Sequence, residues 1–402
     1  MDIYHVSVHL VRLPLKRVIR HASYIRKEVE HVLVRVELDD GTVAYGEGAP
    51  REYVTGESVE DSFRLLRSTS VHRFLSFLRP RSFEQAVEAI AEMPWEYPPA
   101  DKRRRVGNAA RCALELALLD AYGRYFGKPL SLVTAIIAPK LYAPRSEVRY
   151  SAAITGVVGW KLRASALAVR SYGFRDVKVK VAIAGHDDVR RLAIVRGWCG
   201  ANMEIRVDAN EGWSAEEVLI RLQELQPFRV AAVEQPVAHE SRQILAEVRR
   251  QINIPVMLDE SLCSMVDAQT ALAEQTGDLF NLRLSKCGGY IPTLRLAQWA
   301  SEHGIGYQLG CQVGESGILS AAGRHFACSV AGLRWVEGSY DRYLLSNPLT
   351  RHNLTFGWGG WAPALTRPGL GIAVDVESVH RFTVRREEIF DITNTAALDV
   401  ER

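Results

Sequence analysis

Five charged residues recur at a nearly constant step between residues 180 and 286. Two are lysines and three are carboxylates, 25 to 28 residues apart: Lys180, Asp208, Glu234, Asp259 and Lys286. Each ends or closely follows a short run of strand-forming residues, and helical patterns separate these runs. A step of this length fits one strand and one helix. The spacing therefore predicts that all five side chains meet at one end of a parallel barrel.

The three carboxylates predict a metal site. On adjacent strands of one barrel, Asp208, Glu234 and Asp259 would repel one another strongly unless a cation lay among them. Ligands that are all oxygen favour a hard cation, so we expect Mg²⁺, with Mn²⁺ as the other candidate. Any one of them alone would be interpreted as a helix cap or a surface carboxylate, but three at the same step argue against that interpretation.

The lysines predict proton transfer. Lys180 comes one strand before the carboxylates and Lys286 one strand after them, so the two would face each other across the metal. This arrangement suits removal and return of a proton on opposite faces of one carbon atom. In DVKVK, Lys178 shares a strand face with Lys180. Our hypothesis is that Lys178 keeps Lys180 partly uncharged, and a solvated edge strand is the alternative.

The metal would also explain why lysine suffices as a base. A proton α to a carboxylate is only weakly acidic. Bidentate binding of a small-molecule carboxylate substrate to Mg²⁺ would stabilise the dianionic enediolate formed when that proton leaves.

The pattern of elements supports the barrel. From about residue 141 to residue 345, eight strand-like runs alternate with seven helical segments, which predicts an α/β fold of the (β/α)7β TIM-like type. Residues 1–140 read first as β structure, with two strands around an Asp-Asp-Gly turn, and then as helices. The Gly-, Pro- and Trp-rich segment 346–402 is expected to return to the first domain.

Composition excludes several classes of protein. The net charge is only +3 and basic residues are spread along the chain, so nucleic acid binding is not expected, and DKRRR at 101–105 reads as a solvated helix start. The six cysteines form no C-x-x-C pair, which favours reduced thiols in the cytoplasm. We recognise no signal peptide, and no apolar run approaches the roughly 18 residues of a membrane helix.

Five short motifs resemble those of a known family: KVK (178–180), DAN (208–210), EQP (234–236), DES (259–261) and SKCGG (285–289). Together they resemble the enolase superfamily, and within it the muconate lactonizing enzyme subgroup. The resemblance implies an α+β capping domain made from the N-terminal segment and the C-terminal tail. It implies that the lysines are an acid/base pair and the carboxylates are the metal ligands. It also implies supporting residues around them, which are Lys178, Asn210 and Glu260.

In this family the substrate is selected by capping-domain loops and by the ends of the last strands. The loop candidates are residues 20–28, with Arg26, and residues 49–58, with Tyr53; each side chain alone could equally face solvent. Glu315 follows the seventh strand, where a helix cap near Ser316 is the alternative. Glu337 ends the eighth strand, where dipeptide epimerases tend to have Asp-x-Asp and this chain has Glu-Gly-Ser.

Three functions remain open from the sequence. The leading one is racemisation or epimerisation of an amino-acid derivative, either a dipeptide or an N-acyl amino acid. The alternative is a muconate-type cycloisomerase or a syn-dehydratase resembling o-succinylbenzoate synthase, in which one lysine works and the other is a cationic neighbour. The third is a catalytically silent barrel, against which the intact charge cluster argues. By resemblance we expect a homo-oligomer.

Overall fold

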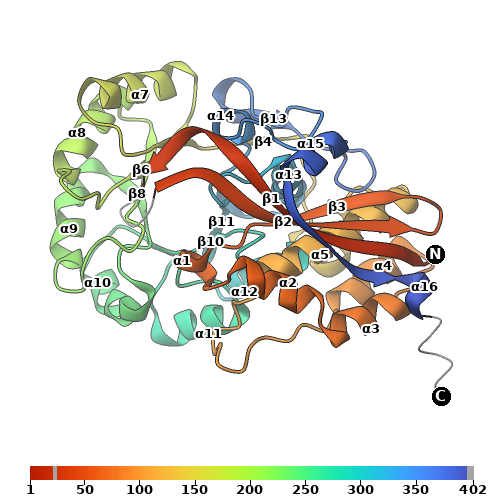
Figure 1. Ribbon diagram of the computed structural model, residues 1–402. Coiled ribbons are helices and arrows are strands. Elements are labelled where there is room, and N and C mark those ends of the chain that lie inside the picture. The colour runs from red at the N-terminus through yellow and green to blue at the C-terminus, as the bar shows by residue number, and fades with distance from the viewer. Residues whose placement is uncertain (21–24, 396–402) are drawn as a thin grey trace.

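The computed structural model describes residues 1–20 and 25–395; the side chains of residues 18–26 and from residue 394 onward lie outside the description. Two units pack together (Figure 1): a barrel of parallel strands surrounded by helices, and an antiparallel sheet with its own helices. The predicted fold, a TIM-like barrel with an α+β cap, is confirmed. None of the helices in the described part of the chain has both the length and the apolar character needed to span a bilayer.

Over residues 152–336, all of them described, the barrel has the predicted alternation of strands and helices. The strands lie in chain order around the sheet: β5 (Ala152–Ile154), β6 (Asp176–Lys180), β7 (Glu204–Asp208), β8 (Val230–Glu234), β9 (Val256–Leu258), β10 (Leu279–Leu282), β11 (Gly306–Leu309) and β12 (Leu333–Val336). The helices between them are α7 (Gly159–Ser171), α8 (Asp188–Cys199), α9 (Val218–Leu225), α10 (Leu245–Gln251), α11 (Met265–Glu274), α12 (Tyr290–Glu302) and α13 (Gly317–Ser329). The backbone N–H of Ser151 donates to the carbonyl of Val336 at 2.8 Å and joins the two end strands.

Inside the barrel, apolar side chains fill one end and charged side chains the other. A small buried cluster, separate from the main core, consists of Ala232, Met257, Leu279 and Trp335. Two positions further along the same strands, and therefore on the same face, stand Glu234, Asp259, Asn281 and Glu337. The inward face of each strand thus changes from apolar to polar toward its carboxyl end, which is the active end of such barrels.

The cap combines both ends of the chain in one antiparallel sheet. Its order is β14–β1–β2–β3, with β1 (Ile3–Arg20), β2 (Ile25–Leu38), β3 (Val43–Gly48) and β14 (Thr383–Asp391). The helices that accompany it are α2 (Val59–Leu66), α3 (Thr69–Phe77), α4 (Phe83–Ala91) and α5 (Asn108–Tyr125). Because β14 pairs with β1, the C-terminal segment returns to the cap as expected.

Helix α5 lies directly on β3. A Cβ atom at Gly46 would lie 2.0 Å from the carbonyl oxygen of Ala113, and one at Gly48 would lie 1.9 Å from that of Ala109. Only glycine permits so close an approach of helix and strand backbones. The helix is buried along most of its length, and its far side reaches the barrel.

Buried carboxylates of the cap bind the N-termini of barrel helices. Glu115 on α5 accepts the backbone N–H of Ile291, in the first turn of α12, at 2.9 Å. Glu47 on β3 accepts those of Ser316 and Leu319, at the start of α13, each at 2.9 Å. Unpaired N–H groups and the helix dipole make these positions favourable for an anion. The cap is therefore fixed to the loops at the polar end of the barrel.

The chain that enters the first strand of the barrel forms two short strands rather than one continuous strand. The N–H of Tyr150 donates to the carbonyl of Gly360, whereas the N–H of the next residue turns to β12, so pairing changes partner at this point. The first part, β4 (Glu147–Arg149), pairs with β13 (Trp361–Pro363) of the tail. The remaining short elements are α1 (Glu52–Thr55), α6 (Leu132–Ile137), η1 (Pro139–Leu141), η2 (Gln226–Phe228), η3 (His239–Ile244), α14 (Asp341–Leu344), η4 (Trp358–Gly360), α15 (Val376–Phe382) and α16 (Ile392–Thr395).

The described parts of the two expected substrate loops contain regular secondary structure. Most of residues 20–28 belongs to the β1–β2 hairpin, because pairing continues to the Arg20–Ile25 pair. Residues 21–24 lie outside the described residues. The hairpin contacts the segment after β12, where Leu15 bridges to Leu345. The second loop, 49–58, contains helix α1, which ends at Gly56 in a left-handed conformation with φ of 71°.

Candidate active site

The three predicted metal ligands lie together at the carboxyl ends of adjacent strands. Asp208 and Glu234 are the last residues of β7 and β8 and are direct partners in the sheet register. Asp259 follows the last residue of β9. Their side chains are at most 3% exposed, so the carboxylates are removed from solvent.

Cationic side chains of the protein lie between these carboxylates. The Nζ of Lys178 is 3.6 Å from Asp208 and 3.4 Å from Glu234. Arg283, which follows β10, pairs with Asp259 and lies 3.4 Å from Glu234. Sequence reasoning missed Arg283. Its position on the same strand face as Asn281, inside an apolar run, was a signal that could have found it.

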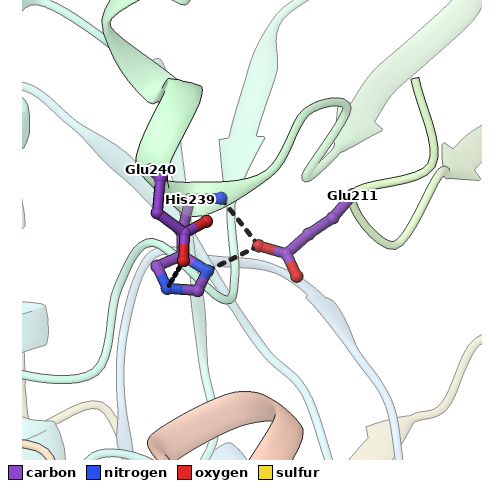
Figure 2. Close-up of side chains that lie close together, drawn as sticks. All are labelled: Glu211, His239 and Glu240. Atoms are coloured by element: carbon purple, nitrogen blue, oxygen red, sulfur yellow. Dashed lines mark hydrogen bonds and ion pairs between the residues drawn. The ribbon is translucent and has the colours of Figure 1, made fainter. Parts of the chain in front are cut away.

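The tightest grouping of metal-capable side chains is elsewhere. Among the residues that the structure describes, the group of three whose ligand atoms all lie within 4.8 Å of one another is Glu211, His239 and Glu240 (Figure 2). It lies on the loops that follow β7 and β8. Nδ1 of His239 is 2.8 Å from Glu211 and Nε2 is 3.0 Å from Glu240, so its donor atoms already bind one another. Sequence reasoning did not foresee this cluster.

The strand-end carboxylates nevertheless fit a hard divalent cation. Burial, together with the charge of Asp208, raises the pKa of Glu234 to about 8. Burial and the charge of Asp259 raise the pKa of Glu260, and its Oε2 is a buried oxygen without a hydrogen-bond partner. Ionised Glu234 and Glu260, which burial and neighbouring carboxylates disfavour, would be stabilised by a cation among these groups. The donor atoms are all oxygen, as Mg²⁺ prefers.

Lys286 is the more enclosed of the two predicted bases. Its side chain is 0% exposed. Its Nζ donates to Oδ1 of Asp259 at 2.7 Å, to the carbonyl of Asp259 at 2.8 Å and to the carbonyl of Asn281 at 2.7 Å. Burial lowers the pKa of Lys286, but the charge of Asp259 outweighs it, so the pKa is raised. All three donors of the ammonium group are used.

Lys180 stands at the other side of the carboxylates. It is the last residue of β6, only part-buried, and its Nζ donates to Oδ1 of Asn210. The backbone N–H of Asn210 in turn donates to Asp208 at 3.0 Å. Asn210 thus contacts both a predicted base and a predicted ligand, and its supporting role stays a prediction.

Lys178 turns toward carboxylates rather than toward solvent. Burial lowers the pKa of Lys178, but Glu234, Glu337 and Asp208 outweigh this and raise it. Its charge is therefore matched by three carboxylates. This pairing explains how the fold accepts a second lysine on the short strand β6, and an effect of Lys178 on Lys180 stays a prediction.

Glu337, a predicted substrate contact, is engaged by the protein itself. Its two oxygens lie 2.7 Å from Lys178 and 2.8 Å from Arg206, and it is 7% exposed. Burial raises the pKa of Glu337, but these two cations outweigh it and lower the pKa to about 2. Arg206 was also missed from the sequence. It lies inside the barrel, 4.8 Å from the ring of Trp335.

The other predicted substrate contacts occupy three separate places. Glu315 lies in the loop between β11 and α13 and accepts the N–H of Gln312 at 2.6 Å, while Ser316 is the cap of α13. Tyr53 lies on α1 of the cap and is 36% exposed. Arg26 belongs to β2, and its side chain lies outside the described residues. Their roles toward a substrate stay predictions.

Comparison with known proteins identifies the family. Residues 161–379 match the family model described as "Enolase C-terminal domain-like". An N-succinyl-L-Arg/Lys racemase of Bacillus cereus is 29% identical over 394 residues, covering 96% of this chain and 98% of the relative. An L-Lys-D/L-Arg epimerase of Methylococcus capsulatus is 28% identical over 92% of this chain and 99% of its own.

Solved structures agree. The crystal structure of the Bacillus cereus racemase has a TM-score of 0.83 with 26% identity and covers 96% of this chain and 100% of its own. A Cytophaga hutchinsonii dipeptide epimerase, solved with Mg and the dipeptide D-Ala-L-Val, shares the fold with a TM-score of 0.81 at 24% identity, covering 97% of this chain and 100% of its own. The family model covers more than half of the chain, and the relatives named here are isomerases. The protein therefore belongs to the enolase superfamily, as its five motifs predicted.

Proposed function

We propose that the protein racemises or epimerises an amino-acid derivative by moving the proton α to a carboxylate. The observation that carries this proposal is the placement of Lys180 and Lys286. One ends β6 and the other follows β10, and the carboxylates of β7, β8 and β9 lie between them. Bases on two sides of one carbon are what inversion requires. The racemase and epimerase relatives support the same reaction class.

Each residue has a role in this proposal. Lys180 takes the α-proton from one face of one enantiomer, and Lys286 gives a proton to the opposite face of the same carbon to form the other enantiomer; in the reverse reaction the two lysines exchange these tasks. Asp208, Glu234 and Asp259 would hold Mg²⁺. When bound, the ion supplies positive charge that stabilises the charge developing on the substrate carboxylate. Burial of these groups excludes water and strengthens every electrostatic interaction among them.

We propose an N-acyl amino acid as the substrate class. A dipeptide with a free amino group would bring an ammonium that needs an anion. At the end of β12, however, both oxygens of Glu337 are engaged by cations. The hydroxyl of Ser339 accepts from Arg324 at 2.7 Å and donates to the carbonyl of Leu354 at 2.9 Å. An acylated nitrogen carries no charge and needs no such partner.

One observation favours a second candidate function. The ammonium of Lys286 is fully hydrogen-bonded, which suits a fixed cationic neighbour as well as a base. In that case Lys180 alone would move protons, as a cycloisomerase or a syn-dehydratase requires.

Deuterium exchange separates the two. The protein is incubated in ²H₂O with Mg²⁺ and each enantiomer of N-succinyl-lysine and N-acetyl-phenylalanine, with L-Ala-L-Glu, and with cis,cis-muconate. Mass spectrometry measures α-deuterium and chiral chromatography measures inversion. Deuterium gain with inversion of an N-acyl amino acid supports the proposal. Inversion of the dipeptide alone would overturn the substrate class, and turnover of muconate without α-exchange would overturn the reaction.

A further inference from the structure

The turn after β7 has an unusual backbone. Asn210 has φ of 43° and Glu211 has φ of 64°, both in the left-handed region. Asparagine tolerates this conformation, but for glutamate it costs about 1–2 kcal/mol. Neighbouring contacts must therefore hold the turn in place.

Those contacts come from the next loop of the barrel. Oε1 of Glu211 accepts both the backbone N–H of His239 at 2.7 Å and its Nδ1 at 2.8 Å (Figure 2). The backbone N–H of Glu211 donates to the carbonyl of Gln235 at 2.8 Å. His239 is the first residue of η3. One carboxylate thus ties the loop after β7 to the loop after β8.

This tie, the contact of Glu211 with His239, lies next to the residue that binds the predicted base Lys180. The side chain of Asn210, the residue before Glu211, accepts a hydrogen bond from the ammonium group of Lys180. The direction of that side chain depends on the backbone of the turn. Any change in the turn therefore moves the acceptor that orients Lys180.

We propose that Glu211 and His239 are positioning residues that act on Lys180 through Asn210. The inference rests on the proposed function, because it assigns Lys180 the work of a base. Lys286 is held instead by Asp259 and Asn281, on the opposite side of the site. Loss of the tie should consequently slow exchange of the α-proton of the enantiomer that Lys180 deprotonates and spare exchange of the other enantiomer. A general loss of structure would impair both.

Three variants isolate the tie. Glu211→Gly removes the carboxylate and also relieves the left-handed backbone, so strain does not confuse the result. Glu211→Gln keeps an oxygen that can accept both bonds from His239 and should restore function. Glu240→Gln is the matched control, because Glu240 contacts the outer nitrogen of the same imidazole, is 72% exposed and does not join the two loops.

The first measurement needs no substrate. The wild type and each variant, with Mg²⁺ present, are acetylated at limiting reagent, and mass spectrometry compares labelling of Lys180 with that of Lys128, an exposed lysine outside the site, while the fully buried Lys286 is the protected reference. In Glu211→Gly we expect Lys180 to react about fivefold faster, the factor that corresponds to one ordinary hydrogen bond. Lys286 should not change, and both Glu211→Gln and Glu240→Gln should resemble the wild type. Unchanged labelling of Lys180 would overturn the inference.

The second measurement is α-deuterium exchange of N-succinyl-L-lysine and N-succinyl-D-lysine. The enantiomer served by Lys180 is the one whose exchange is lost in Lys180→Ala. Glu211→Gly should slow exchange of that enantiomer by about tenfold or more, because small misplacements of a base are costly, and should leave the other unchanged. Equal slowing of both would overturn the inference. If the wild type exchanges neither, the proposed function fails for this probe, and the labelling result alone decides the positioning role.

Discussion

The two sides of the carboxylate site hold their lysines differently. On the β10 side, Lys286 is fully buried and makes three hydrogen bonds. On the β6 side, Lys180 is part-buried and bonds to the side chain of Asn210. Two bases proposed for mirror-related tasks thus stand in unlike surroundings.

The surroundings of the two lysines differ because the cap contacts one side of the site and loops of the barrel contact the other. The side chain of Asn108, at the start of α5 in the cap, donates to the carbonyl of Lys286 at 2.7 Å and to that of Cys263 at 2.8 Å. Arg103, also from the cap, donates to the carbonyl of Glu260 at 2.7 Å. The turn at Asn210, by contrast, is held by loops of the barrel itself. We infer that the cap stabilises the Lys286 side directly and leaves the Lys180 side to the barrel.

The largest expected effect comes from removing the lysine on each side of the site in turn. Lys180→Ala and Lys286→Ala should each reduce racemisation of an N-acyl amino acid by about a thousandfold or more, because inversion needs both bases. Each variant should still exchange the α-proton of one enantiomer, and the two variants should keep opposite enantiomers. Chiral chromatography and deuterium incorporation measure the two quantities. Loss of all exchange in Lys180→Ala alone would favour the one-base alternative.

A second contrast concerns the carboxylates on the two sides. Asp259→Asn would leave Arg283 and Lys286 without their buried partner, so we expect the free energy of unfolding to fall by about 3 kcal/mol even without metal. Asp208 contacts one cation at 3.6 Å, its charge opposes the ionisation of Glu234, and asparagine keeps an oxygen that can accept the N–H of Asn210, so Asp208→Asn should lower this free energy by less than Asp259→Asn does.

Urea unfolding with EDTA and with Mg²⁺ tests both variants. Wild-type protein should gain stability from Mg²⁺, and both variants should lose that gain. If Asp208→Asn kept the full gain, Asp208 would not be a ligand.

The strand-end residues were predictable because their spacing reflects the length of a strand and helix. Lys180, Asp208 and Glu234 each end a strand, and the apolar alternation within the strand fixes which face they take. The family motifs gave the same positions. The local sequence pattern was therefore sufficient to predict the barrel and the charged residues at the carboxyl ends of its strands.

Contacts between distant segments were not predictable from local pattern. Arg206 meets Glu337 across the barrel, 131 residues away, and Asn108 meets Lys286 from another unit, 178 residues away. Nothing in the neighbouring residues of either sequence position encodes such a partner. Part of the loop expected at 20–28 is strand for a related reason, since the pairing between β1 and β2 extends to Arg20 and Ile25.

A smaller effect sharpens the role of the cap. Asn108→Ala removes two hydrogen bonds to buried carbonyls, which should lower the free energy of unfolding by about 2 kcal/mol. It should also slow exchange of the enantiomer served by Lys286 more than that of the other. Asn347→Ala is the matched control, because it removes an asparagine bond to Ser378 away from the site. Equal slowing of both enantiomers would contradict a one-sided brace.

The most gradual effect is a pH dependence on the same side. Burial raises the pKa of Glu115, which binds the start of α12, from 4.5 to about 7. The folded protein therefore holds this proton more tightly than the unfolded chain. The contribution to stability is greatest below the ordinary pKa and declines as the pH rises through about 7, by about 3 kcal/mol at most. Glu57, whose burial also raises its pKa to about 7, adds the same trend.

The test is thus the difference between wild type and Glu115→Gln in urea unfolding from pH 4.5 to 8. A smaller decline in the variant is expected, and parallel curves would show that Glu115 remains ionised in the folded protein.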